Sequence, residues 1–574
     1  MPTPTAKWDE TADLVIMGSG AAAMSAAVRA ADLGLHPLIF EATDKYGGST
    51  AISGGVCWIA NNMHMAGKVD DNPESAFEYL RHLVGDTISD EALRQYTANA
   101  TRMLETLQAN GAINMDSLES YPDYYPEAPG GRPGGRSMES VPFDATSLDQ
   151  TTFAQLRRPH PQSQVMGWFG LTARQAQIIL ANNWRSKWAL FTALVGCILR
   201  YFSRRKYGRD TRLTAGNALI GRFRKALVDR NVQIRLSSTV TGLIRENNRV
   251  VGVTVENNGE ITRIGARCGV LLAAGGFSRN AKMRQTHQQA PITAEWGAGN
   301  LRNQGDGHNM GAEVGGVLAQ MDEAWWTPTI LIPRQELAWV IVVEKNLPHC
   351  IIVDQSGHRF LNEAAPYLDV VKAMYAAHKE TDRAIPAWMI FDATFRHKYP
   401  AGPLAPGYAV PDKRLSKRYL DQFLVKANTV EQLAAKTQID ADTLQEGITR
   451  FNAQAVSGVD SDFNRGDSLS DRYYGDPNVK PNPCLGPIVT PPFYALQVWP
   501  GDLGTKGGLV TDSGARVLDS EGQPIGGLYA AGNCAASIMG KTYPGAGGTI
   551  APALTFGFLS AESAHHDAQA EVTP

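Results

Sequence analysis

The chain has few cysteines, and their spacing suits neither a metal site nor a disulfide framework. Six occur among 574 residues, and no two stand in a CxxC arrangement. Zinc sites and disulfide-rich folds use closer and more regular spacings. We therefore expect no metal, and the composition fits a reducing compartment. The six residues are Cys57, Cys197, Cys268, Cys350, Cys484 and Cys534.

An excess of charge of either sign is also lacking. Lys and Arg number 54 and Asp and Glu number 57, which gives a formal net charge of -3. Binding to nucleic-acid phosphates needs a basic field, so this balance argues against a nucleic-acid partner. The sequence shows no internal repeat, and its first strand-like run begins at Asp13, so we expect no cleavable signal peptide. These features together predict a cytoplasmic protein.

The chain is long and rich in glycine. Its 574 residues are 43% hydrophobic and include 56 glycines, many of them in doublets. The length is about four times the roughly 150 residues typical of one domain, so we expect more than one core. Glycine doublets are typical of places where the backbone approaches a ligand closely.

The N-terminal segment carries the pattern of a dinucleotide-binding turn. Residues 13–17 form a short apolar run typical of a buried strand, Gly18 and Gly20 stand in a GxGxxA turn, and a helix is expected from Ala21 to about residue 33. Glu41 follows at the distance at which an acidic residue binds the adenosine ribose. Phosphates would lie at the helix N-terminus, where free N–H groups attract anions. The pattern predicts a Rossmann-like nucleotide site.

Further glycine-rich segments favour FAD over NAD. The doublets at 47–48 and 54–55 resemble the loop beneath the ribityl chain and ring of a flavin. The segment 527–533 resembles a second flavin-contacting strand, with Asn533 where an acidic residue is common. The glycine-doublet loop contains no histidine, the residue through which related flavoproteins attach FAD covalently, so we expect non-covalent FAD.

Glycine-bounded strands near both ends of the chain predict an interrupted α/β domain. The runs at 269–274 and 527–531 each lead into a glycine. We expect a discontinuous Rossmann-like FAD-binding domain over 1–287 and 497–574, with an inserted α+β catalytic or substrate domain over 288–496.

An extra helical insertion is expected at 155–212. Apolar side chains recur there at steps of three and four, which places them on one helix face, and basic residues crowd 200–209. The uncharged stretch 188–199 would be about 18 Å long as a helix, too short for roughly 30 Å of bilayer hydrocarbon. Two readings stay open: 184–209 lies in a membrane interface, or it packs on the protein or on a sister subunit. The stripe is Trp184, Trp188, Phe191, Val195, Ile198 and Phe202.

The nucleotide-binding turn, the glycine doublets and the segment 527–533, together with the segment 305–311, resemble segments of the fumarate reductase and succinate dehydrogenase flavoprotein superfamily. Within it, four more segments resemble the 3-ketosteroid Δ1-dehydrogenase family, and the similarity covers nearly the whole chain apart from the insertion. The four segments are PDYYP at 122–126, NEAAPY at 362–367, DLGTKGG at 502–508 and TYPGAGG at 542–548.

The nucleotide motif and the resemblance together imply one set of FAD-binding residues. They come from the N-terminal turn, the acidic residue and its neighbour after the second strand, the two glycine doublets, and four segments far downstream. The predicted contacts are Gly18, Ser19, Gly20, Ala22, Ala23, Glu41, Ala42, Gly47, Gly48, Ser49, Thr50, Ser53, Gly54, Gly55, Ala274, Gly275, Gly276, Asp306, Gly532, Asn533, Gly548 and Thr549.

The chemistry of the family removes two hydrogens from adjacent ring-A carbons of a 3-ketosteroid. The resemblance implies that the Tyr543 hydroxyl and the Gly547 N–H bind the 3-keto oxygen, and that Tyr367 takes the proton from C2 while flavin N5 takes hydride from C1. It gives Tyr124 the role of helper to Tyr367, with the neighbouring Tyr125 as an alternative. A tyrosine base has an ordinary pKa near 10, so alkaline pH should favour activity.

The sequence leaves other functions open. A fumarate reductase-like enzyme would need Arg and His to bind a dicarboxylate, and the segment around Tyr543 has neither. A 3-oxo-5α-steroid 4-dehydrogenase would also use tyrosines around ring A and stays open, as does a non-catalytic flavin-binding protein. The partners expected are a 3-ketosteroid and a quinone or another electron acceptor. A homo-oligomer and a peripheral place on the cytoplasmic membrane face remain alternatives.

Overall fold

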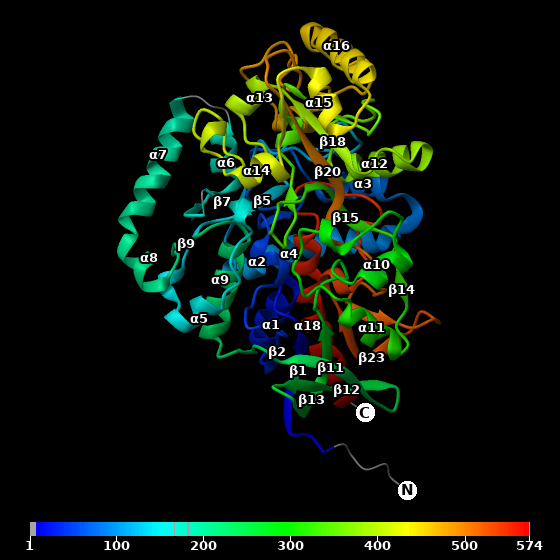
Figure 1. Cartoon of the computed structure of the whole chain (residues 1–574). Helices are drawn as coiled ribbons and strands as arrows, with labels where there is room; N and C mark the ends of the chain where they lie inside the picture. The colour runs from blue at the N-terminus through cyan, green and yellow to red at the C-terminus, as the bar shows by residue number, and fades with distance from the viewer. Residues whose placement is uncertain (1–6, 166, 181–183, 573–574) are drawn as a thin grey trace.

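The computed structural model describes residues 7–165, 167–180 and 184–572. Figure 1 shows a lower body, an upper part that contains β18 and β20, and a set of helices with α7 and α8 that stands to one side. Among the helices in these ranges, none combines the length and the apolar character that crossing a membrane requires.

The lower body is built around an eight-stranded sheet in the order β10-β2-β1-β13-β12-β23-β22, with β11 paired to β12. Strand β1 (Glu10–Met17) lies parallel between β2 (Pro37–Phe40) and β13 (Glu260–Leu272), and the end of β13 pairs with β23 (Pro524–Ala530). Segments from both ends and the middle of the chain therefore meet in one sheet, as predicted for a discontinuous domain. The other strands are β10 (Gln233–Arg235), β11 (Thr239–Glu246), β12 (Arg249–Asn257) and β22 (Arg516–Leu518).

Two helices pack closely against each other at the point where β1 ends. Helix α1 (Ala21–Asp32) begins directly after the glycine-rich turn, and α18 (Ile550–Val572) runs beside it, blue and red in Figure 1. A Cβ at Gly557 would lie 2.2 Å from the Ala22 carbonyl oxygen, so this approach requires glycine. The small residues of α1 thus fix its N-terminus beside the end of the sheet.

The upper part is built around a six-stranded sheet in the order β16-β15-β20-β18-β17, with β19 paired to β20. The long central strand β20 (Phe493–Thr505) pairs with β15 (Ala324–Ile330) and β18 (Ala387–Phe391). It crosses the domain boundary expected at 496/497, and the division into domains stays a proposal. The remaining elements of the sheet are β16 (Trp339–Val340), β17 (Cys350–Val353) and β19 (Val425–Ala427); its helices include α12 (Tyr367–Thr381), α15 (Val430–Thr437) and α16 (Ala441–Ser457).

The remaining elements connect these two sheets or cover them. Between β2 and the insertion they are α2 (Gly48–Ile52), β3 (Val56–Trp58), α3 (Pro73–Val84), α4 (Asp90–Ala109), β4 (Met115–Ser117), β5 (Ser137–Ser140), β6 (Phe143–Asp144) and α5 (Gln150–Gln155). Further along they include α9 (Ala215–Asp229), α10 (Ala281–His287), α11 (Asp306–Glu313), β14 (Leu318–Ala319), α13 (Ala393–Lys398), α14 (Lys417–Gln422), α17 (Leu469–Tyr473) and β21 (Gly508–Leu509).

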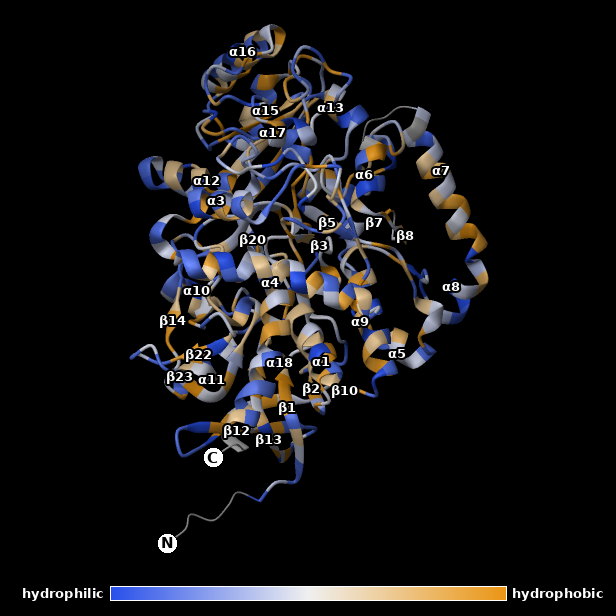
Figure 2. Ribbon diagram, turned by 180° about the vertical axis from the view of Figure 1, so that it is seen from behind, coloured by the Kyte–Doolittle hydropathy of each residue, from blue (hydrophilic) through white to orange (hydrophobic). Residues whose placement is uncertain are grey.

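The insertion contains the helices α6 (Ala173–Leu180), α7 (Trp184–Leu199) and α8 (Tyr201–Tyr207); its residues 166 and 181–183 lie outside the described ranges. The predicted apolar stripe faces outward, since Trp188 is 62% exposed, Phe191 54%, Ile198 60% and Phe202 83%. In Figure 2 much of α7 is orange although it stands at the edge of the molecule. The insertion is helical as predicted, but the single helix expected for the stripe is divided at Arg200 into α7 and α8, and these four side chains are exposed to solvent.

Candidate active site

One cavity of about 410 Å³ is lined both by the glycine-rich turn and by the three tyrosines that the sequence singled out. Of the predicted site residues, Ala23, Gly47, Gly276 and Gly548 do not line it. Those that do are Gly18, Ser19, Gly20, Ala22, Glu41, Ala42, Gly48, Ser49, Thr50, Ser53, Gly54, Gly55, Ala274, Gly275, Asp306, Gly532, Asn533 and Thr549, with Tyr124, Tyr367, Tyr543 and Gly547.

The glycine turn leaves room for a ligand at the N-terminus of α1. Gly18 has φ +100°, and a Cβ there would lie 2.4 Å from the Ala273 carbonyl oxygen. Only glycine therefore allows the turn after β1 to pass this close to the backbone of Ala273. At Gly20 a Cβ would meet only Thr50 Oγ1, at 3.7 Å, within the cavity lining. The space and the helix N-terminus together suit a pyrophosphate, and this part of the cavity fits FAD.

The acidic residue after β2 is held in a defined orientation. The Ser19 hydroxyl donates to Glu41 Oε2 at 2.5 Å, while the N–H and hydroxyl of Thr43 donate to Oε1 at 3.1 and 2.8 Å. Ser19 Oγ in turn accepts from the N–H of Gly47 at 2.9 Å. Gly47, which does not line the cavity, thus helps to hold Ser19 and through it Glu41. Glu41 is placed to accept hydrogen bonds from the hydroxyls of a ribose.

Residues from the middle of the chain complete the cofactor side of the cavity. Ser49 Oγ accepts from the Asn300 N–H and from Asn303 Nδ2, both at 3.1 Å, and both asparagines line the cavity. Asn533 Oδ1 accepts from Trp325 Nε1 at 3.1 Å. The sequence motifs did not reveal Asn300 and Asn303, because they lie outside the glycine-rich segments.

Three buried tyrosines from separate segments meet in the cavity. Tyr124 lies in the loop after β4, Tyr367 is the first residue of α12, and Tyr543 lies in the loop before α18. Their ring centroids are 5.3 Å apart for Tyr124 and Tyr367, 5.4 Å for Tyr124 and Tyr543, and 5.2 Å for Tyr367 and Tyr543. The fold therefore brings together the three tyrosines that the sequence singled out.

The Tyr543 loop is fixed on both sides of the ring. The buried Lys506 ammonium donates to the Thr542 carbonyl, and the Pro544 carbonyl accepts from the Tyr79 hydroxyl at 2.6 Å and from the Tyr124 N–H at 3.0 Å. The Tyr543 hydroxyl lies 2.9 Å from Thr549 Oγ1. These contacts hold the phenol in place before any ligand binds, which is the condition for an effective hydrogen-bond donor.

Gly547 follows in the same loop and also lines the cavity. Its φ is +95°, and a Cβ there would lie 2.5 Å from the backbone N and Cα of Cys57. The position therefore requires glycine, and it brings main chain to the cavity wall near Tyr543.

Burial sets the ionisation of the tyrosines. It raises the pKa of Tyr367 well above the ordinary value, and the nearby Tyr543 adds to that rise, whereas a hydrogen bond with Tyr124 lowers the pKa. Burial likewise raises the pKa of Tyr124 and of Tyr543. All three hydroxyls are thus protonated donors at neutral pH, and Tyr124 is the neighbour that eases ionisation of Tyr367.

The structure separates Tyr124 from Tyr125. The Tyr125 hydroxyl donates to Asp369 Oδ2 at 2.9 Å, and Tyr125 does not line the cavity. Tyr124 lines it and contacts both other rings. The geometry therefore favours Tyr124 for the helper role.

The tyrosine end of the cavity also contains residues that sequence motifs missed. Tyr121 and Tyr474 line it with their hydroxyl oxygens 2.8 Å apart. Tyr474 belongs to a segment without a motif, so only the fold reveals it. Other lining residues in this group are His160, Gln162, Val340, Val342 and Leu503.

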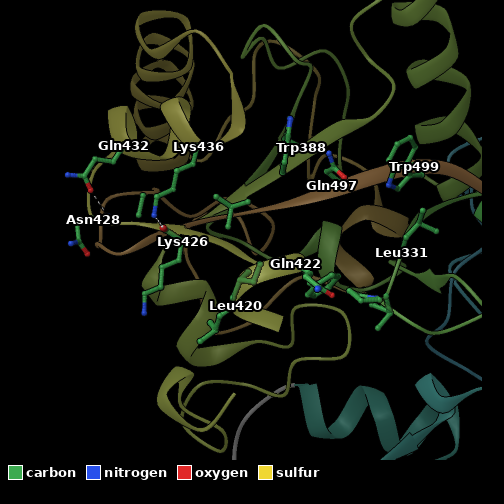
Figure 3. Close-up of a pocket in the computed structure, with 16 residues that line it drawn as sticks. Leu331, Trp388, Leu420, Gln422, Lys426, Asn428, Gln432, Lys436, Gln497 and Trp499 are labelled. Carbon is green, nitrogen blue, oxygen red and sulfur yellow. Dashed lines mark hydrogen bonds between the residues drawn. The ribbon is translucent and has the colours of Figure 1, made fainter. Parts of the chain in front are cut away.

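A second, larger cavity of about 920 Å³ lies elsewhere, over the strands β18, β19 and β20 (Figure 3). Trp388 and Gln497 are cross-strand neighbours in its wall, and Trp499 follows on β20. None of the predicted cofactor or catalytic residues lines it. Its size alone does not make it the active site.

The chain is similar in sequence to known FAD-binding proteins. A family model for the FAD binding domain matches residues 13–550. The 3-oxosteroid 1-dehydrogenase of Mycobacterium tuberculosis is 42% identical over 562 residues, which cover 96% of this chain and 97% of that protein. The chain belongs to the 3-ketosteroid Δ1-dehydrogenase family. The predicted mixed α/β FAD-binding fold is therefore confirmed, and FAD is the cofactor.

Solved structures extend the comparison. The crystal structure of 3-ketosteroid delta1-dehydrogenase from Sterolibacterium denitrificans, in complex with 1,4-androstadiene-3,17-dione, superposes with a TM-score of 0.94 at 42% identity, covering 98% of this chain and 100% of that chain. The 3-ketosteroid-delta4-(5alpha)-dehydrogenase from Rhodococcus jostii RHA1 superposes with a TM-score of 0.66 at 21% identity, covering 98% and 99%. The second likeness shows a shared fold.

Proposed function

We propose that this protein is an FAD-dependent 3-oxosteroid 1-dehydrogenase that converts 3-keto-4-ene steroids to 1,4-dien-3-ones. The proposal rests on one observation: Tyr124, Tyr367 and Tyr543 lie in contact in the same cavity that is lined by the glycine-rich turn of the FAD site. The related Sterolibacterium enzyme was crystallised with a steroid of the product class. An apolar steroid also suits a cavity end walled by aromatic and aliphatic side chains.

Tyr543 and Gly547 bind the substrate carbonyl. The Tyr543 hydroxyl and the Gly547 N–H donate to the 3-keto oxygen, on which negative charge develops when the α-proton leaves. Preorganised donors of this kind lower the barrier by about 3–4 kcal/mol each in comparable enzymes. The fixed Tyr543 loop supplies that preorganisation.

Tyr367 takes the proton and Tyr124 assists it. The Tyr367 oxygen accepts the proton from C2, and the Tyr124 hydroxyl donates to that oxygen and stabilises its ionised form. Bound FAD supplies the oxidant, accepting the hydride from C1. The substrate therefore loses one proton and one hydride, and a C1–C2 double bond forms.

The test is an anaerobic titration of the purified flavoprotein with androst-4-ene-3,17-dione. We expect the visible flavin band to bleach and mass spectrometry to show a 1,4-dien-3-one. A 5α-reduced ketosteroid serves as the comparison substrate. Bleaching only with that steroid, with a 4-ene product, would assign the chain to the sister 4-dehydrogenase activity instead.

We further propose that α7 and α8 dock the enzyme on an anionic membrane surface. The exposed Trp188, Phe191 and Phe202 would enter the interface, while the exposed Arg205 and Lys206 would meet lipid headgroups. Sterols and quinones both partition into bilayers, so docking would bring substrate and a quinone acceptor to the enzyme.

Vesicle flotation tests this docking. The triple variant Trp188→Ser/Phe191→Ser/Phe202→Ser should lose flotation with anionic vesicles, whereas Val456→Ser/Val459→Ser, which alters exposed valines at the end of α16, should not. Equal flotation of all forms would refute it. A change in sedimentation from dimer to monomer in the triple variant, without flotation of the wild type, would assign the stripe to a sister subunit.

A further inference from the structure

The segment before Tyr367 is held by two buried residues from a distant turn. We call residues 363–366 the Tyr367 strap. Three successive backbone carbonyls of this segment accept hydrogen bonds from Lys345 and Asn346. Lys345 Nζ donates to the Glu363 carbonyl at 2.9 Å and to the Ala365 carbonyl at 2.6 Å, and Asn346 Nδ2 donates to the Ala364 carbonyl at 2.9 Å. The strap then leads directly into the helix that begins with Tyr367.

The two residues also bind each other. Lys345 Nζ makes its third hydrogen bond to Asn346 Oδ1, at 3.0 Å. An ammonium has three N–H donors, so every donor of Lys345 is used, and two of the three hold the strap. Both side chains are buried, which makes any unpaired donor costly and the arrangement correspondingly specific.

The turn that presents Lys345 is anchored in its own right. Arg465 Nη2 donates to the Lys345 carbonyl at 3.2 Å, and its Nη1 donates to Glu363 Oε2 at 3.1 Å. Arg359 also binds Glu363, at 2.7 Å. The strap is thus tied at its start by a buried ion-pair network and along its length by Lys345 and Asn346.

This pair lies beside the catalytic tyrosines. A small cavity of about 20 Å³ is lined by Lys345, Asn346 and Ala364 together with Tyr124 and Tyr367. A shift of the strap would therefore move the first residue of α12 relative to Tyr124 and Tyr543. Proton abstraction depends on that placement, since a displacement of about 1 Å can cost about 100-fold in rate.

We propose that Lys345 and Asn346 are positioning residues for Tyr367 that set the distance between its oxygen and C2 of the steroid. The inference rests on the proposed 1-dehydrogenation. It assigns no contact with substrate or FAD to either residue. Their effect is on the proton-abstraction step, while steroid binding and FAD binding depend on other parts of the cavity.

The test is single-turnover flavin bleaching under anaerobic conditions with androst-4-ene-3,17-dione and its 2,2-dideuterated form. Asn346→Leu and Lys345→Met should bleach about 10- to 100-fold more slowly, with steroid affinity within about threefold of the wild type. The deuterium isotope effect at C2 should rise, because proton abstraction becomes slower than hydride transfer. Asn346→Asp, which keeps the acceptor for Lys345 but loses the donor to the Ala364 and Asp471 carbonyls, should lie between these variants and the wild type.

Lys436→Met is the control for a Lys-to-Met change away from the site, because the exposed Lys436 also donates through Nζ to a backbone carbonyl, that of Lys426, and lines the second cavity. It should bleach at the wild-type rate with the wild-type isotope effect. If Lys345→Met fails to fold or to retain FAD, Asn346→Asp decides the matter.

A C2 isotope effect unchanged in folded, FAD-loaded Asn346 variants would overturn the inference while leaving the proposed function intact. No bleaching of the wild type by this steroid would refute the proposed function itself, and the inference would fall with it. The two failures are therefore distinguishable from the wild-type measurement alone.

Discussion

Two aromatic clusters of this molecule face opposite environments. Tyr124, Tyr367 and Tyr543 are buried side by side, whereas Trp188 and Phe202 stand out from the body on the insertion. The tyrosine segments are tied by hydrogen bonds from Lys506, Lys345 and Asn346 among others; the insertion presents its rings on helices at the edge of the molecule. The side chains proposed for chemistry are thus buried on segments fixed by hydrogen bonds, whereas the rings proposed for docking are exposed.

The largest expected effect is on the base. Tyr367→Phe removes the proposed proton acceptor, and general-base removal costs about 10²- to 10⁴-fold. We expect flavin bleaching by the steroid to slow by that order while dithionite still reduces the flavin at the normal rate. Tyr125→Phe is the control, because the Tyr125 hydroxyl binds Asp369 outside the cavity. Similar losses in both variants would show that the buried cluster is structural.

Tyr543→Phe should come next. It removes one of the two proposed donors to the 3-keto oxygen, and loss of one such donor costs about 10²- to 10³-fold in kcat. The remaining Gly547 N–H sustains residual turnover. Steady-state kinetics with androst-4-ene-3,17-dione measures the loss, and a change confined to KM would contradict the assigned role.

The pH dependence should be smaller and of known sign. A Tyr367 base reacts in its deprotonated form, and burial raises the pKa of Tyr367 above the ordinary value near 10, so on this proposal the reactive fraction grows as pH rises. We expect kcat/KM to increase from pH 7 to 9 by at most about tenfold per unit. A plateau below pH 8, or a fall with rising pH, would argue against a tyrosine base.

The smallest effect is expected from the insertion. The exposed stripe does not line the cavity, so Trp188→Ser/Phe191→Ser/Phe202→Ser should change kcat with a soluble steroid in buffer by less than about twofold. Steady-state turnover measures this. A large loss would show that the exposed stripe influences the active site, and the contrast between the two clusters would disappear.

Local sequence patterns predicted much of the fold. The helix expected from Ala21 to about residue 33 is α1, and the strand-like runs near 13–17 and 38–40 are β1 and β2. Turn glycines and apolar runs are local signals, so they can be recognised in the sequence without knowing which elements pack against them. The three tyrosines were found through motifs of the family rather than through periodicity.

What the sequence could not predict depends on contacts between distant segments. Tyr474, Asn303 and the Lys345–Asn346 pair reach the site only through the tertiary fold, and no local spacing marks them. The stripe on α7 has the same periodicity whether it faces a core or solvent. Only the fold shows that it faces outward.

The most direct test of the account uses androst-4-ene-3,17-dione that is dideuterated at C1. The account predicts that this label slows anaerobic flavin bleaching and that the 1,4-dien-3-one product keeps one of the two deuteriums. Bleaching at the unlabelled rate, with a product that retains both deuteriums, would contradict oxidation at C1 and with it the assignment of the tyrosine site.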